Sequence, residues 1–135
     1  MRLPRALYVI VVTATTAAAA AACSSTDSPA AQVAQRFANA VDASGAAAAC
    51  SYLAPATKSA LEQSAGKPCP AALREEHLPH AGAVRSSATY GTMAQVHLSG
   101  DTYFLSRFND RWKVMAAGCT PRKGQQPYNC LMQGG

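Results

Sequence analysis

The stretch TMAQVHLSGDTYFLSRFNDRWKVMAA, residues 92–117, decides the fold. Apolar and polar side chains alternate along it with the two-residue period of half-buried strands. Three runs show this alternation: 92–98, 102–108 and 111–117. Ser99-Gly100-Asp101 and Asn109-Asp110 separate the runs, and these residue types are typical of hairpin connections. The stretch predicts an antiparallel meander of three strands, with residues 83–90 as a fourth strand before it.

The alternation also predicts which side chains face the core. In the first run Ala94, Val96 and Leu98 share one face of the strand. In the other two runs we expect Trp112, together with Phe104 and Phe108, to form the core of the sheet. On the third strand Val114 and Ala116 are expected on the face of Trp112.

Helical signals precede the strands. Ser28 is a suitable N-cap and Pro29 suits the first helical position, while Val33 and Phe37 begin an apolar face with a spacing of three to four residues. We expect helices at 29–42, 46–53 and 56–64, and one further helical turn at 70–76. Helices followed by a run of strands predict an α+β fold, in which the helices pack on one face of a curved antiparallel sheet of three to four strands.

The N-terminus has the pattern of an export signal. Arg2 and Arg5 precede an uncharged stretch that ends in small residues, which is the layout of a signal peptide over residues 1–22. Cys23 follows Ala20-Ala21-Ala22, and this resembles the lipobox of bacterial lipoproteins. Residues 23–28 are then a lipidated cysteine and a polar tether, and residues 29–135 a single domain. The lipobox prefers Leu where Ala20 stands, so ordinary secretion and an uncleaved anchor remain open.

The cysteine count fits this arrangement. An exported chain with an odd number of cysteines leaves one thiol to explain, and Cys23 is used for lipid. The other four cysteines can form two disulfides, as an oxidising compartment favours. We favour Cys50–Cys69 and Cys119–Cys130 among the three pairings, because each joins elements adjacent in the chain.

Charge does not indicate a nucleic-acid partner. The chain has 12 Lys and Arg; Arg2 and Arg5 belong to the leader, which leaves 10 beside 7 acidic residues. These charges are scattered, and no basic run or basic-aromatic stripe stands out.

The hairpin YFLSRFNDRWKV, residues 103–114, carries a resemblance. Together with a long first helix and two short ones, it looks like the nuclear-transport-factor-2-like superfamily, a cone-shaped α+β roll shared by ketosteroid isomerases and polyketide cyclases. The segment AAGC…P…PY-C, within residues 116–130, also resembles small exported lipoproteins of actinobacteria. The resemblance implies a cavity inside the cone, and we expect Tyr90, Tyr103, Phe104 and Trp112 as candidates to line it.

The isomerase chemistry of that superfamily does not carry over. It needs an acidic base facing the cavity, but Asp101 and Asp110 both lie in predicted turns. We therefore assign no catalytic residue and no cofactor. Glu75-Glu76-His77 and His80 include metal-ligand types, but Pro79 breaks their spacing, so we assign no metal.

These patterns favour an exported lipoprotein held through Cys23 at the outer face of the cytoplasmic membrane. We expect a non-catalytic module that binds a small molecule or an envelope partner. A small enzyme of the isomerase or cyclase type, and a purely structural envelope lipoprotein, are the alternatives.

Overall fold

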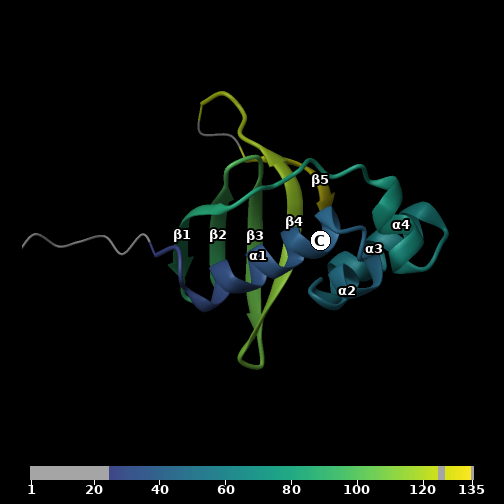
Figure 1. Cartoon of the computed structure of the whole chain (residues 1–135), viewed down its shortest axis with the longest axis horizontal. Coiled ribbons are helices and arrows are strands. Elements are labelled where there is room, and N and C mark those ends of the chain that lie inside the picture. Colours follow the sequence, from purple (N-terminus) through teal and green to yellow (C-terminus); the bar gives the residue numbers. More distant parts are fainter. Residues whose placement is uncertain (1–24, 125–126, 135) are drawn as a thin grey trace, which may run out of the picture.

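The computed structural model describes residues 25–124 and 127–134, in which four helices are followed by five strands (Figure 1). The helices are α1 Pro29–Asp42, α2 Ala46–Ser51, α3 Pro55–Ala65 and α4 Cys69–Glu75. The strands are β1 Val84–Tyr90, β2 Met93–Leu98, β3 Thr102–Phe108, β4 Arg111–Thr120 and β5 Asn129–Gln133. The predicted signal peptide and the predicted lipidation of Cys23 lie outside the described residues.

The strands form one antiparallel sheet in the order β1-β2-β3-β4-β5. Helix α1 lies across one face of this sheet, and α2, α3 and α4 gather beyond its β4–β5 side (Figure 1). The link between α2 and α3 also pairs with β4, because Ala54 N–H donates to Val114 O at 2.9 Å and Val114 N–H donates to Tyr52 O at 2.8 Å. The predicted α+β class is confirmed.

The predicted count of three to four strands is too low by the fifth strand. Residues 129–133, expected to be part of an irregular tail, form β5 beside β4. Two long-range contacts explain this difference: Cys130 is bonded to Cys119, and Met132 is buried opposite Ala117. The Cys119–Cys130 bond was expected from the sequence, but the burial of Met132 against β4 has no local signal in a segment rich in Gly, Pro and Gln.

The core lies between α1 and the sheet. Phe37 of α1 meets Tyr103 of β3 edge to face, with ring centroids 5.3 Å apart, and both side chains are buried. Ala94, Val96 and Leu98 are buried on the same side, as the alternation of residues 92–98 predicts. Helix α1 begins with the expected Ser28 cap, whose Oγ accepts from Ala31 N–H at 3.1 Å.

The expected aromatic core of the sheet is wrong. Leu105 and Val114 pair across β3 and β4 and are fully buried, whereas Phe104 points to the face without α1 and Phe108 is 40% exposed. Trp112 packs half-buried on the core side. The sequence interpretation placed these three rings on one face because it had no measure of register.

A β-bulge in β4 explains the remaining error. Phe104 pairs with Ala116 while Leu105 pairs with Val114, so Met115 is an extra residue. The extra residue shifts the alternation, and Ala116 therefore does not share the face of Val114. Asn109 and Asp110 have positive φ, as expected for the tight turn between β3 and β4.

Two disulfides cross-link the fold, and they have the pairing favoured from the sequence: Cys50–Cys69 joins α2 to α4, and Cys119–Cys130 joins β4 to β5. Closing a loop of 19 residues contributes ~3 kcal/mol in the chain-entropy estimate. The hydrophobic core extends from Ala30 to Met132. A chain that begins at residue 23 therefore includes all of these described core residues and both disulfides.

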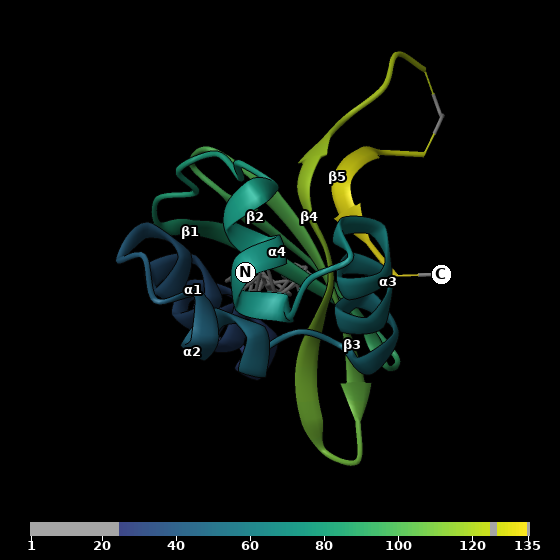
Figure 2. The ribbon, with the colours of Figure 1, turned by 90° about the vertical axis from the view of Figure 1, so that its right-hand side faces the viewer.

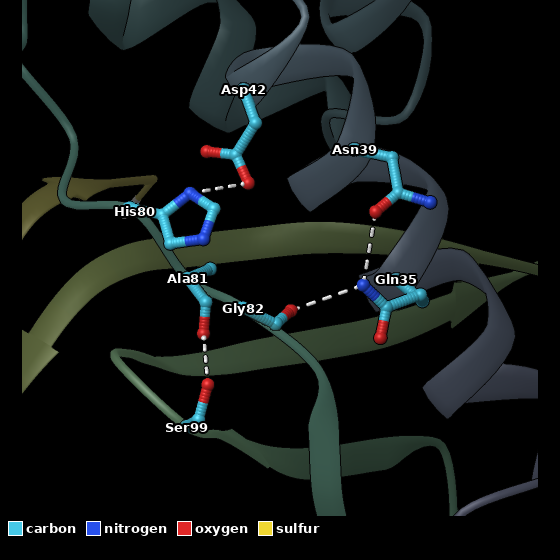
Figure 3. Close-up of polar contacts among 7 residues, drawn as sticks. All are labelled: Gln35, Asn39, Asp42, His80, Ala81, Gly82 and Ser99. Carbon is cyan, nitrogen blue, oxygen red and sulfur yellow. Dashed lines mark hydrogen bonds and ion pairs between the residues drawn. The ribbon is translucent and has the colours of Figure 1, made fainter.

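The connection from α4 to β1 is held by side chains of α1 (Figure 3). Gln35 Nε2–H donates to Gly82 O at 3.1 Å, and Gln35 Oε1 accepts from Val84 N–H at 2.9 Å. On the other side of the connection, Ser99 Oγ–H donates to Ala81 O at 3.3 Å. One amide side chain thus satisfies a carbonyl and an N–H on one side of this extended segment, while Ser99 N–H and Gly100 N–H donate to Ala83 O and Ala81 O on its other side.

Replacing Gln35 tests how much its two hydrogen bonds to the α4–β1 connection stabilise the fold. We expect Gln35→Ala to lower the free energy of unfolding by about 1–3 kcal/mol, since it leaves two part-buried backbone groups without partners. Gln32→Ala is the matched control, because the exposed Gln32 amide bonds only Asp27 O. Urea unfolding followed by circular dichroism measures both variants, and equal losses would contradict the role of Gln35.

Candidate functional site

The four residues expected to line one cavity are dispersed. Tyr90 is 69% exposed at the end of β1, while Tyr103 is 1% exposed in the core. Phe104 lies on the opposite face of the sheet, where its ring meets Tyr128 edge to face at 5.1 Å. Only Trp112 borders a groove on the helix side. Alternation along strands causes this separation, because neighbouring residues of one strand face opposite sides.

A groove of about 530 Å³ lies between the first half of α1, the end of α2 and the start of β4. We call it the Trp112 groove. Successive turns of α1 supply Val33 and Arg36, which lie on one side of the helix because they are three residues apart. Tyr52 closes one end, where the α2–α3 link pairs with β4. Trp112 lies at the start of β4, next to the β3–β4 turn.

The groove carries an excess of positive charge. Arg36, Arg111 and Lys113 line it, and Asp110 is the one carboxylate among its lining residues. Lys113 is held in place, because its Nζ donates to Ser51 O at 2.7 Å. Arg107, next to this group, places its guanidinium 6.0 Å from the centroid of the Trp112 ring. Guanidinium and ammonium groups beside an aromatic ring suit an anionic ligand that also has a flat or apolar part.

The sequence analysis missed this cluster. It found no basic-aromatic stripe, although residues 107–113 read RFNDRWK and mix three cations with two aromatic rings. Seven residues that span a tight turn do not form a stripe on one strand. The cations become neighbours when the hairpin closes and pairs Arg107 with Trp112. Arg36 joins them only through the packing of α1 on the sheet.

A second, apolar trough lies on the opposite face of the sheet. It has a volume of about 370 Å³, and Phe104, Met115 and Tyr128 line it with Met93 at its edge. The rings of Phe104 and Tyr128 already pack against each other there. This trough and the Trp112 groove are on different faces, so they do not combine into the single internal cavity that the resemblance implied.

Asp101 lies in the β2–β3 turn as expected, but it is buried, with 8% of the residue exposed. One carboxylate oxygen accepts from Thr102 N–H at 2.7 Å and Cys119 N–H at 2.9 Å, and the other accepts from Gly118 N–H at 2.9 Å. Burial raises the pKa of Asp101, and these three hydrogen bonds oppose the rise. The carboxylate is surrounded by backbone donors and does not reach the Trp112 groove.

Burial likewise raises the pKa of Tyr103, and the negative charges of Asp101 and Asp42 add to the rise. The phenol therefore stays neutral over the physiological range.

His80 and His97 have different partners. His80 Nδ1 lies 2.9 Å from Asp42 Oδ2 beside α1 (Figure 3), and His97 Nδ1 lies 3.1 Å from Thr102 Oγ1 on the sheet. Among residues 25–124 and 127–134, no three His, Cys, Asp or Glu side chains gather as metal ligands would.

The comparisons with known proteins give no relative. No family model matches the chain, and no curated protein or solved structure matches it. Within the part of the chain that the structure describes, none of the helices combines the length and the apolar character that crossing a membrane requires.

Substitution of Asp101 tests how much its three hydrogen bonds stabilise the fold. Asp101→Asn places an amide N–H₂ against a backbone N–H, and we expect it to lower the free energy of unfolding by about 1–3 kcal/mol. The exposed turn residue Asp110 provides the control, since Asp110→Asn should change stability by less than about 0.5 kcal/mol.

The difference in stability between the wild type and Asp101→Asn should change with pH in one direction. A carboxyl whose folded-state pKa lies above its unfolded value binds a proton more readily in the native state, so stability falls as pH rises through the folded pKa. Asparagine has no such titration. The stability advantage of the wild type over Asp101→Asn should therefore be largest below the ordinary value of 3.8 and shrink above it. An advantage that grows with pH would show that the three N–H bonds outweigh burial.

Proposed function

We propose that this chain is an exported lipoprotein, held by Cys23 at the outer face of the cytoplasmic membrane, that acts as a non-catalytic binding module for an anionic ligand. The Trp112 groove is the binding site. The observation that carries the proposal is the convergence of Arg36, Arg111 and Lys113 around a single indole ring.

The electrostatics of the groove support an anionic ligand. Residues 107–113 and Arg36 together contribute four of the ten cations that follow Cys23. Like charges gathered on one surface repel each other, and an anion relieves that repulsion while it accepts hydrogen bonds. The side wall formed by Val33 and Tyr52 adds apolar area that a bare inorganic ion would not use.

The disulfides support export. Disulfide bonds form and persist in oxidising compartments and are rare in the cytosol. Two of them in a domain of this size agree with the signal-peptide pattern of residues 1–22. A diacylated cysteine buries two long chains, which is sufficient for stable attachment to a membrane.

We further propose that the fold is a variant of the cone-like roll of the nuclear-transport-factor-2-like superfamily. The long helix α1 across an antiparallel meander supports this relationship. The geometry gives less support to the isomerase alternative. Asp101, the buried acid, already bonds three backbone N–H groups and lies away from the groove.

Lipidation is tested by metabolic labelling with palmitate in a bacterial host that processes lipoproteins. The wild-type chain should take up label, and Cys23→Ala should lose it completely, because the acyl chains have no other acceptor in the lipobox. Ser25→Ala is the matched control and should label like the wild type. Label that persists in Cys23→Ala would exclude the proposed anchor.

Ligand binding is tested through Trp112, the only tryptophan of the chain. Titration with tripolyphosphate as an anionic probe should change the fluorescence of Trp112, and Arg36→Gln should raise the Kd about tenfold through the loss of one charged hydrogen bond. Arg85→Gln, on exposed β1, removes the same charge away from the groove and should leave the Kd unchanged. Fluorescence that does not respond, or equal effects of the two variants, would contradict an anionic site at Trp112.

A further inference from the structure

Exposed apolar side chains gather at one end of the sheet. In a meander the β1–β2 and β3–β4 turns lie at the same end, and here they are in contact, since Arg107 N–H donates to Thr92 O at 2.8 Å. Tyr90, Met93 and Phe108 border these two turns and are 69%, 45% and 40% exposed. We call this surface the hairpin end. In the described residues it holds three of the four large apolar side chains that are most exposed; the fourth is Leu131 on β5.

Two cations lie at the hairpin end. Arg107 and Arg111 are both exposed; Arg111 pairs with Phe108 across the turn, and Arg107 lies beside Trp112 on the other face of the hairpin. Asp110 is the one acid of this turn, so the tip of the hairpin carries net positive charge. The β3–β4 hairpin extends beyond α1 and α2 (Figures 1 and 2). Phe108, at the end of β3 next to its turn, is 40% exposed.

The tether starts near the same end. Ser28 Oγ lies 2.9 Å from Ser87 Oγ, which fixes the start of α1 on β1 three residues before Tyr90, or about 10 Å along the strand. From Cys23 to Ser28 the chain spans at most about 18 Å even when fully extended. A lipid on Cys23 therefore keeps the hairpin end within on the order of 30 Å of the membrane surface.

We propose that the hairpin end is a second membrane contact, which docks on headgroups of anionic phospholipids. Tyr90, Met93 and Phe108 enter the headgroup region, where aromatic rings with a polar neighbour are favoured, and Arg107 and Arg111 lie beside lipid phosphates. The inference rests on the proposed anchor at Cys23. It also names lipid phosphate as an anion within reach of the Trp112 groove, which opens beside this hairpin.

The shape of the surface favours a membrane over a protein partner. Two turn tips form a small, projecting surface, whereas stable protein interfaces bury about 800 Å² on each partner. A lipid surface adapts to a projecting tip, and positive charge around apolar side chains is the pattern that anionic membranes bind.

The test uses residues 23–135 with Cys23→Ser, so that no acyl chain contributes. This chain should sediment with vesicles that contain phosphatidylglycerol and should not sediment with pure phosphatidylcholine, and added salt should weaken the binding. We expect Phe108→Ser and Arg111→Gln each to reduce partitioning roughly fivefold. Leu131→Ser and Arg122→Gln are the matched controls, because both residues are exposed and lie on the β4–β5 side, and they should bind like the parent chain.

A spectroscopic readout reports insertion directly. In a Trp112→Phe background, Phe108→Trp should show a blue shift of its emission with phosphatidylglycerol vesicles and none with phosphatidylcholine. Complete competition by soluble glycerol phosphate would indicate a site for free phosphate and overturn the docking proposal. A dimer in analytical ultracentrifugation that Phe108→Ser dissociates would indicate that a second copy covers this end, and it would also overturn the proposal.

Failure of the two proposals can be distinguished. Loss of vesicle binding with palmitate labelling intact removes the hairpin contact and leaves the anchor. Persistent labelling of Cys23→Ala removes the anchor, whatever the vesicles show.

Discussion

The buried carboxylate of Asp101 joins the start of β3 to a distant part of β4, and one end of the molecule depends on it. Its oxygens accept from Thr102, Gly118 and Cys119 N–H, so a turn between β2 and β3 is bonded to the strand that lies beyond β3. Gly118 has φ of +65°, and a Cβ there would lie 2.9 Å from the Leu131 side chain. The Asp101 carboxylate and the absence of a side chain at Gly118 together permit this close approach of β4 to β5.

Two further contacts fix other elements close to the Asp101 hydrogen bonds. Cys119 is bonded to Cys130 directly beside it, and the disulfide holds β5 against β4. Thr57 of α3 donates to Met115 O at 2.9 Å, next to the β-bulge, so the third helix is fixed to the same region. Hydrogen bonds from three backbone N–H groups offset part of the cost of burying this carboxyl group. The fold thus brings a glycine with positive φ, a buried acid and a disulfide close together in space.

The two ends of the sheet therefore differ in character. At one end Asp101 is buried and hydrogen-bonded and a disulfide cross-links β4 to β5, whereas the hairpin end presents exposed rings and cations. A small domain has little core to hold it, so stability concentrated at one end leaves the other free for contacts with other molecules. The position of the Trp112 groove and of the tether near the hairpin end is the physical basis of both proposals.

Local patterns in the sequence determined most of the elements. The Ser28 cap and apolar spacing defined α1 to its observed bounds, alternation defined β3, and the Asn109-Asp110 turn followed from residues that tolerate positive φ. The favoured cysteine pairs were also confirmed: Cys119–Cys130 joins consecutive strands, and Cys50–Cys69 joins α2 to α4 across α3. The predicted α2 and α3 deviate from the observed helices only by one or two residues at their ends.

Only the tertiary structure decided the features that depend on register and on long-range contact. Residues 129–133 became a strand because β4 offered a free edge and a disulfide, and Asp101 became buried because Gly118 and Cys119 approach its turn. Arg36 came together with Trp112 through the packing of α1 on the sheet. Local side-chain patterns specify helices, strands and turns, but a single bulge at Met115 changes which residues share a face, and only the assembled sheet fixes that register.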